Sequence, residues 1–233
     1  MIRDFLLSSV LAHGFLDIFV MNRKLNILLL YLASIGTYRC FMLINPELGT
    51  LLFYILSCYH FGKDFQIITG ERSGLVNWTG CYILCNTVEC TDGLKVWMKT
   101  LYLFGMSPMS SFFFLELITF LRLISIAAIF LSENKKLIIF SILSFLININ
   151  LTVYHTIMLY MITIHVPLSL LQFYNRYGIT PIKIWFSCSI GLTNLTWKFK
   201  IYKEIIPLIV SITMSHMILI SLWQIKNNRR ALN

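Results

Sequence analysis

Two pairs of ionisable side chains share one spacing within apolar sequence. His13 and Asp17 stand four residues apart in the first apolar run, and His60 and Asp64 repeat the spacing in a later one. Residues four apart lie on one face of a helix, one turn from each other. Imidazole is a common metal ligand, and a metal-bound histidine generally donates its other ring N–H to a carboxylate or carbonyl. Each pair suits a metal ligand with an orienting carboxylate, or a structural hydrogen bond without metal.

The other three histidines also lie in or beside apolar runs. His165 stands two residues before Pro167, whose missing N–H kinks or ends a helix and frees a carbonyl. His155 precedes His165 by ten residues, about 15 Å of helical rise, so one compact site would use His165 and leave His155 a structural or lumen-facing role. His216 lies inside the last apolar run, where an interhelical hydrogen bond is as good an interpretation as a metal ligand.

A glycine accompanies each of the two His–Asp pairs. Gly14 follows His13 directly, and Gly62 follows His60 by two residues. A glycine in a membrane helix removes side-chain bulk and lets another helix approach closely. Both pairs are therefore expected at tight contacts between helices.

The composition indicates the solvent in which these helices fold. Hydrophobic residues make up 58% of the 233 residues and charged residues only 12%, against about a quarter charged in soluble domains. The net charge is +9, but the basic residues gather between apolar runs, as at Arg23-Lys24 and Lys135-Lys136. Such clusters are typical of topology-setting loops and give no indication of nucleic-acid binding. A membrane helix carries ionisable groups at a cost of several kcal/mol, so these groups must face a partner or a cavity.

The apolar runs predict an all-α fold, because only helices and closed barrels satisfy the backbone within lipid and these runs are too long for barrel strands. The expected spans are 3–21, 25–44, 48–65, 74–91, 109–132, 136–149, 151–173 and 204–224. Segments 94–106 and 180–196 are shorter or more mixed, so the prediction is about eight spans, within a range of seven to nine. Asn148 and Asn150 mark a turn. The chain is expected to be one membrane-embedded domain over 1–233, multi-pass in a cell or plasma membrane, with the more basic loops in the cytoplasm.

Other polar groups in these runs are expected to serve structure. Glu116 and Arg122 share the fifth run but are six apart, a poor spacing for an ion pair, and Glu89 lies near the end of the fourth. Six cysteines are spread along the chain without a C-x-x-C motif. Cys81, Cys85 and Cys90, which can share one helix face, are interpreted as small buried hydrophobic residues and no disulfide framework is expected.

Four blocks resemble the motifs of the Brp/Blh-type β-carotene 15,15′-dioxygenases. They are His13-Gly14-x-x-Asp17, His60-Phe61-Gly62 followed by Asp64, the run 160–165 that ends in a histidine, and residues 213–217 around the late histidine. They occur in family order and span nearly the whole chain. Two positions depart from the family pattern: Ser169 replaces the second histidine of the third motif, and Ser215 replaces the proline before the late histidine.

The resemblance implies a multi-helix membrane enzyme with non-haem Fe(II). The family splits β-carotene across its central double bond with O₂ to give two retinals. The implied ligands are His13, His60 and His165, and His216 or His155 is the candidate for the place that Ser169 leaves. Asp17 and Asp64 would orient the ligands. The implied partners are the apolar carotenoid, O₂ and the bilayer, with a retinal-binding opsin as a candidate recipient of the product.

A carotenoid is an apolar rod dissolved in the bilayer, so its enzyme needs an apolar, aromatic-lined tunnel. Candidate lining residues are Phe112, Phe113, Phe120, Trp78 and Trp185. Packing or anchoring at the membrane interface is the ordinary role of such residues.

Two other functions remain open from sequence. A transporter or proton-coupled carrier would use His–Asp relays inside the membrane. An inactive relative would bind a carotenoid or retinal without cleaving it, and Ser169 favours that alternative. A microbial-rhodopsin function is disfavoured, because the last apolar run from Ile205 to Trp223 has no lysine for a Schiff base.

Overall fold

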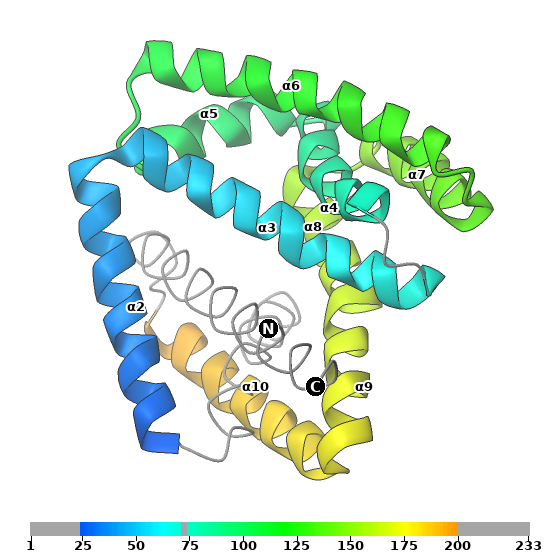
Figure 1. Ribbon diagram of the computed structural model, residues 1–233. Helices are drawn as coiled ribbons and strands as arrows, with labels where there is room; N and C mark the ends of the chain where they lie inside the picture. The colour runs from blue at the N-terminus through cyan, green and yellow to red at the C-terminus, as the bar shows by residue number, and fades with distance from the viewer. Residues whose placement is uncertain (1–23, 71–73, 200–233) are drawn as a thin grey trace, which may run out of the picture. The chain divides into compact units, whose positions relative to one another are not determined.

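Every regular element in the described part of the chain is a helix, which confirms the all-α class (Figure 1). The computed structural model describes residues 24–70 and 74–199. The α-helices are α2 (Lys24–Ile44), α3 (Pro46–Thr69), α4 (Gly74–Asn86), α5 (Gly93–Leu103), α6 (Pro108–Leu131), α7 (Lys135–Asn148), α8 (Val153–Tyr160), α9 (Val166–Tyr177) and α10 (Thr180–Phe199). A 3₁₀ turn, η1 (Thr87–Glu89), follows α4, and a π-helical segment, η2 (Met161–His165), joins α8 to α9.

The helices form two compact units. One unit is Phe41–Leu159. The other comprises Met1–Cys40 and Tyr160–Asn233, of which residues 24–40 and 160–199 are described. The continuous helical stretch α8–η2–α9 has residues in both units.

Polar caps between the apolar runs determine where the helices begin and end. Asn45 precedes α3 and its side chain accepts a hydrogen bond from the Leu48 backbone N–H at 3.0 Å. Ser107 does the same for α6, accepting from the Ser110 backbone N–H at 3.1 Å. A proline follows each cap, where its missing N–H is tolerated. Gly70 ends α3 in the left-handed conformation, with φ of 75°.

The observed bounds of α6 and α7 lie one residue from the predicted 109–132 and 136–149. The turn predicted at Asn148 and Asn150 is confirmed: α7 ends at Asn148, and the Asn150 N–H donates to the Ile147 carbonyl at 3.1 Å. The predicted run 74–91 stops earlier, at Asn86. The chain turns there because the Thr91 N–H donates to the Leu151 carbonyl at 3.0 Å, which ties this loop to the start of α8. The predicted spans 3–21 and 204–224 lie outside the described residues.

Within the described residues, two helices are long and apolar enough to cross a membrane. They are Pro108–Leu131 and the combined helix Val153–Asn175, and one third of the most apolar window of each is buried. Leu32–Ile44 and Ile182–Gly191 are apolar but shorter. Helix α3 has sufficient length, but it carries Glu47, Lys63 and Asp64.

The unit Phe41–Leu159 has its hydrophobic core around α4, which packs against α3, α6 and α7. Helix α5 packs against α6. The core cluster contains Tyr54 from α3, Cys81 and Cys85 from α4, Leu101 from α5 and, from α6, Phe114, Leu115 and Ile118. This core holds α3, with its His–Asp pair, in a fixed position against α4.

Candidate functional site

His60 and Asp64 lie on α3, one helical turn apart, in the unit Phe41–Leu159. The Asp64 side chain is buried and His60 is half-buried. Burial of a carboxylate in an apolar protein requires a polar partner, and both residues interact with other groups of the chain. The pair therefore occupies the interior face of α3.

Gly62, between these two residues, lies against the backbone of α4. A Cβ at Gly62 would stand 2.7 Å from the Asn77 carbonyl oxygen and 2.9 Å from the Asn77 Cα. Gly80 is the α4 residue at the same contact. A Cβ at Gly80 would overlap the Cys58 carbonyl oxygen and the Gly62 backbone nitrogen of α3. The prediction that Gly62 permits a close helix approach is confirmed. Gly14 lies outside the described residues.

Side-chain hydrogen bonds continue this contact toward the end of α3. The Gln66 amide nitrogen donates to the Asn77 side-chain oxygen at 2.8 Å, and the Lys63 ammonium donates to the Gln66 side-chain oxygen at 3.0 Å. The Lys63 ammonium also lies 4.8 Å from the centroid of the Tyr59 ring. The half-buried Lys63 ammonium is thus stabilised by the Gln66 side-chain amide and by the Tyr59 ring.

His165 is the last residue of the π-helical segment η2 and is 1% exposed. Pro167 follows in the first turn of α9 and cannot donate the backbone hydrogen bond expected at its position. The predicted disturbance is confirmed, and its form is a π-helical turn rather than a helix end. The imidazole stacks on the Tyr160 ring, with centroids 6.4 Å apart and an interplanar angle of 24°. Ser169 is half-buried, one turn further along α9.

His155 differs from His165 in exposure and in its contacts, although both belong to one continuous helical stretch. Its side chain is exposed, and its Nδ1 lies 2.7 Å from the Thr152 hydroxyl. The Thr152 hydroxyl also accepts a hydrogen bond from the His155 backbone N–H at 3.3 Å. This arrangement at the start of α8 agrees with the structural role predicted for His155.

The metal site predicted from sequence is only partly covered by the described residues. His13, Asp17 and His216 lie outside them, and His60 and His165 belong to different units. Across residues 24–70 and 74–199, no group of three histidine, cysteine, aspartate or glutamate side chains is placed to hold a metal ion. Imidazole is a common iron ligand, and the Asp64 carboxylate, one turn from His60, is the kind of group that orients a metal-bound histidine.

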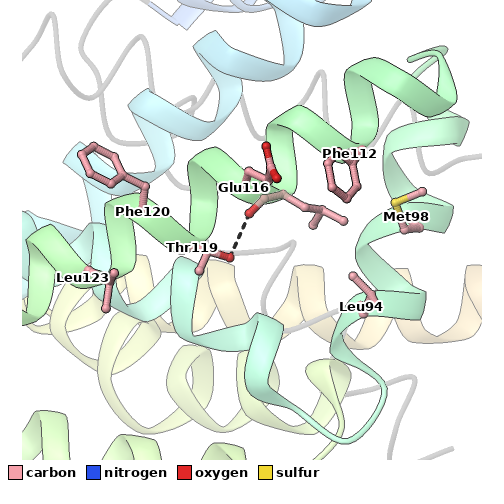
Figure 2. Close-up of a pocket in the computed structure, with 8 residues that line it drawn as sticks. Leu94, Met98, Phe112, Glu116, Thr119, Phe120 and Leu123 are labelled. Atoms are coloured by element: carbon pink, nitrogen blue, oxygen red, sulfur yellow. Dashed lines mark hydrogen bonds between the residues drawn. The ribbon is translucent and has the colours of Figure 1, made fainter.

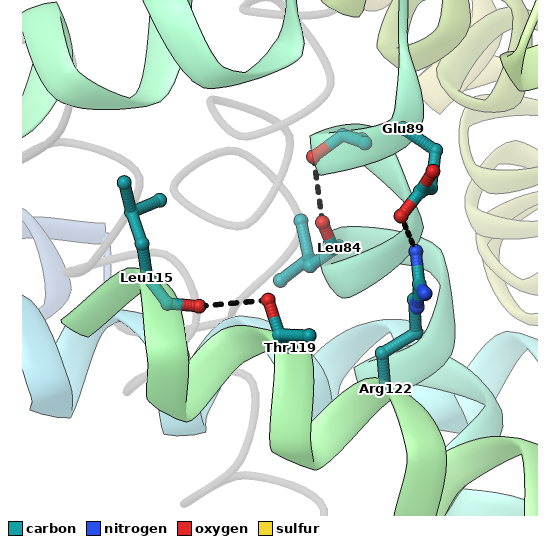
Figure 3. Close-up of polar contacts among 6 residues, drawn as sticks. Leu84, Glu89, Leu115, Thr119 and Arg122 are labelled. Carbon is teal, nitrogen blue, oxygen red and sulfur yellow. Dashed lines mark hydrogen bonds and ion pairs between the residues drawn. The ribbon is translucent and has the colours of Figure 1, made fainter. Parts of the chain in front are cut away.

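Arg122 pairs with Glu89 of η1 in a salt bridge between segments, rather than with Glu116 on its own helix (Figure 3). The side chains of Arg122 and Glu89 are 19% and 37% exposed. The poor spacing of Glu116 and Arg122 was apparent from sequence, but the pairing with Glu89 depends on how η1 meets α6. The ion pair joins the loop after α4 to the middle of α6.

An open groove runs between α5 and α6, with a volume of about 560 Å³. Figure 2 shows Leu94 and Met98 of α5 on one side and Phe112, Glu116 and Phe120 of α6 on the other. Of the five predicted tunnel residues, Phe112 and Phe120 line this groove.

The remaining predicted tunnel residues lie elsewhere. Phe113 is exposed on α6 beside the groove residues, Trp78 is exposed on α4, and Trp185 is half-buried on α10 in the other unit. Within the unit Phe41–Leu159, two of the four predicted tunnel residues therefore line the groove, and Trp78 and Phe113 do not.

A cluster of Tyr54, Cys81 and Cys85 fills the space between α3 and α4. The Tyr54 hydroxyl contacts the Cys85 sulfur and lies 3.8 Å from the Cys81 sulfur, and the two sulfurs are 3.6 Å apart. All six cysteines are free thiols, as expected, and Cys81, Cys85 and Cys90 are buried. No sequence motif marks Tyr54, because its role depends on the helix that packs against it.

No protein-family model, no curated protein and no solved structure matches this chain.

Proposed function

We propose that the chain is a multi-pass integral membrane protein that binds non-haem iron and cleaves β-carotene, or a related carotenoid, with O₂ to give retinal. The single observation that carries the proposal is the environment of His165. This residue is the third ligand implied by the motif resemblance, and it is fully buried at a π-helical turn in a helix apolar enough to cross a membrane. Single π-helical turns inside α-helices occur frequently at functional sites.

The buried imidazole of His165 needs polar interactions and has a restricted orientation. His165 interacts with another group of the chain, and a metal-bound histidine generally donates its second ring N–H to such a group. Ring stacking on Tyr160 restricts the orientation of the imidazole, which lowers the entropy lost on ligation. His155 has neither burial nor stacking of this kind, so the two histidines offer a matched comparison.

Each site residue has a defined task in this proposal. His13, His60 and His165 bind iron, and His216 is the candidate fourth ligand. Iron bound to these residues would supply the activation of O₂.

The carboxylates and the glycine act on the ligands. Asp64 accepts the second ring N–H of a ligand histidine and fixes its orientation, and Asp17 does the same for its own pair. Gly62 keeps α3 against α4, so that the His60 ring stays at one depth in the protein.

The surface of the unit Phe41–Leu159 suits a lipid environment. Large apolar side chains of α6 and α7 are exposed, among them Phe113, Phe130, Ile139 and Leu143. Large apolar side chains that form a contiguous exposed patch mark a membrane or partner interface. A bilayer setting brings the protein to the phase in which a carotenoid dissolves.

The test uses the full chain in bacterial cells that make β-carotene, with retinal measured by chromatography and iron measured by elemental mass spectrometry of the purified protein. Wild type is expected to retain iron and form retinal. His60→Ala and His165→Ala are expected to lose both, while His155→Ala retains both. Asp64→Asn is expected to bind iron about tenfold more weakly, because the ligand loses its orienting partner.

Other outcomes would overturn the proposal. Iron content unchanged in both His60→Ala and His165→Ala would remove these residues from the metal site. Absence of iron in the wild type, together with proton flux after reconstitution into liposomes, would favour the carrier function. Iron binding without retinal formation would favour a carotenoid-binding relative without activity.

A further inference from the structure

The groove between α5 and α6 combines apolar walls with one carboxylate. Leu94 and Met98 line it from α5, and Phe112, Glu116, Thr119 and Phe120 line it from α6 (Figure 2). Its volume, about 560 Å³, lies within the range of small-molecule sites. Glu116 is the charged residue of this lining, and it lies in the helix Pro108–Leu131, which is long and apolar enough to cross a membrane.

Glu116 has no partner in the described part of the chain. The arginine of the same helix, Arg122, is taken by Glu89. Lys95 and Lys99 of α5 do not line the groove. In the membrane setting of the proposed function, on which this step rests, an exposed carboxylate on an apolar helix is unfavourable by several kcal/mol unless a cation or a hydrogen-bond donor reaches it. The groove therefore favours an occupant that brings a positive charge.

The polar atoms of the groove are acceptors. The Thr119 hydroxyl donates to the Leu115 carbonyl at 3.0 Å, so its hydrogen is used within α6. Its remaining lone pairs and the Glu116 carboxylate both accept hydrogen bonds. Phe112 and Phe120 also line the groove, and the face of an aromatic ring attracts cations through the ring quadrupole.

We propose that this groove binds a lipid-soluble amine, an apolar chain or ring system that ends in an ammonium group. Glu116 binds the ammonium, the rings of Phe112 and Phe120 lie against it, and the leucine and methionine side chains of α5 contact the apolar part. A pure hydrocarbon such as a carotenoid leaves the carboxylate without a partner, so this site is separate from carotenoid cleavage and does not depend on the proposed iron site.

The experiment uses the full chain in lipid nanodiscs with a photoreactive hexadecylamine probe, protonated at neutral pH, and the labelled peptides are identified by mass spectrometry. Labelling is expected to concentrate on peptides of α5 and α6. Unlabelled hexadecylamine is expected to compete about tenfold better than hexadecanol or hexadecanoate, since a charge-assisted hydrogen bond from its ammonium group contributes at least that factor.

Matched variants separate a built site from partitioning into lipid. Glu116→Gln is expected to lower labelling about tenfold, whereas Glu133→Gln, an exposed glutamate in the turn before α7, leaves it unchanged. Phe112→Leu is expected to weaken labelling and Phe113→Leu to leave it unchanged, although these neighbours are 57% and 58% exposed.

Three results would contradict the assignment. Equal competition by the alcohol or the carboxylate would show that charge is not recognised. Labels spread evenly over exposed apolar helix faces would show lipid partitioning only. Cross-linking of the groove to a second copy of the chain, with no probe labelling, would identify it as a protein interface. Competition on the wild-type protein decides the matter even where a variant does not fold.

Discussion

The two helix contacts made by α3 with α4 and by α5 with α6 differ in the size of the residues at the contact. Between α3 and α4, Gly62 and Gly80 bring backbone against backbone. Between α5 and α6, the side chains of Leu94, Met98 and Phe112 line an open groove. Small residues thus join one helix pair closely, and large side chains line an open groove at the other. The close contact positions the His–Asp pair of α3, and the open one leaves space for a ligand.

The largest effect on stability is expected at Gly80. The methyl group of Gly80→Ala would overlap backbone atoms of Cys58 and Gly62, which cannot move unless α3 and α4 separate. We expect a loss of about 3 kcal/mol in the free energy of unfolding. The measurement is denaturant unfolding in mixed micelles, followed by circular dichroism.

Gly36→Ala in α2 is the control for Gly80→Ala. A Cβ at Gly36 meets no atom within 4 Å, so the gain in helix propensity stabilises the protein by about 1 kcal/mol or less. A gain of similar size in Gly80→Ala would show that helix propensity, rather than the contact between α3 and α4, sets the stability.

A smaller effect is expected at Gly62. Gly62→Ala brings its methyl group to 2.7 Å from the Asn77 carbonyl oxygen, a milder overlap than at Gly80, and the expected loss is about 2 kcal/mol. The double variant is expected to lose about 1 kcal/mol less than the sum, because helices already separated by one methyl group resist the second less. Strict additivity in the same unfolding assay would mean that the two glycines do not share one contact.

Local signals in the sequence predicted much of the fold. The apolar runs and their polar or proline boundaries gave α6 and α7 to within one residue, and Pro167 predicted an irregular helix beside His165. The position of Gly62, two residues after His60, predicted a close contact with another helix.

Pairings between distant segments could not be predicted in this way. Gly80, Tyr54 and the partner of Arg122 depend on which faces of α4 and η1 meet their neighbours. One sequence records the spacing along each helix, and it does not record the rotation of one helix against another. The convergence of His13, His60 and His165 is a relation of the same kind and stays a prediction.

The smallest effect on stability is expected at Phe112, which lines the open groove between α5 and α6. Phe112 is 57% exposed, so Phe112→Ala removes few packed contacts and should change the free energy of unfolding by about 0.5 kcal/mol or less. Phe114, two residues on, is 7% exposed and meets the Tyr54 ring edge to face at 5.8 Å, so Phe114→Ala should lose about 3 kcal/mol. Unfolding of both variants under one set of conditions measures the difference. A loss at Phe112 as large as that at Phe114 would mean that α5 closes onto α6 in the membrane. The groove would then be filled by its own side chains, and Glu116 would need its partner from within the protein.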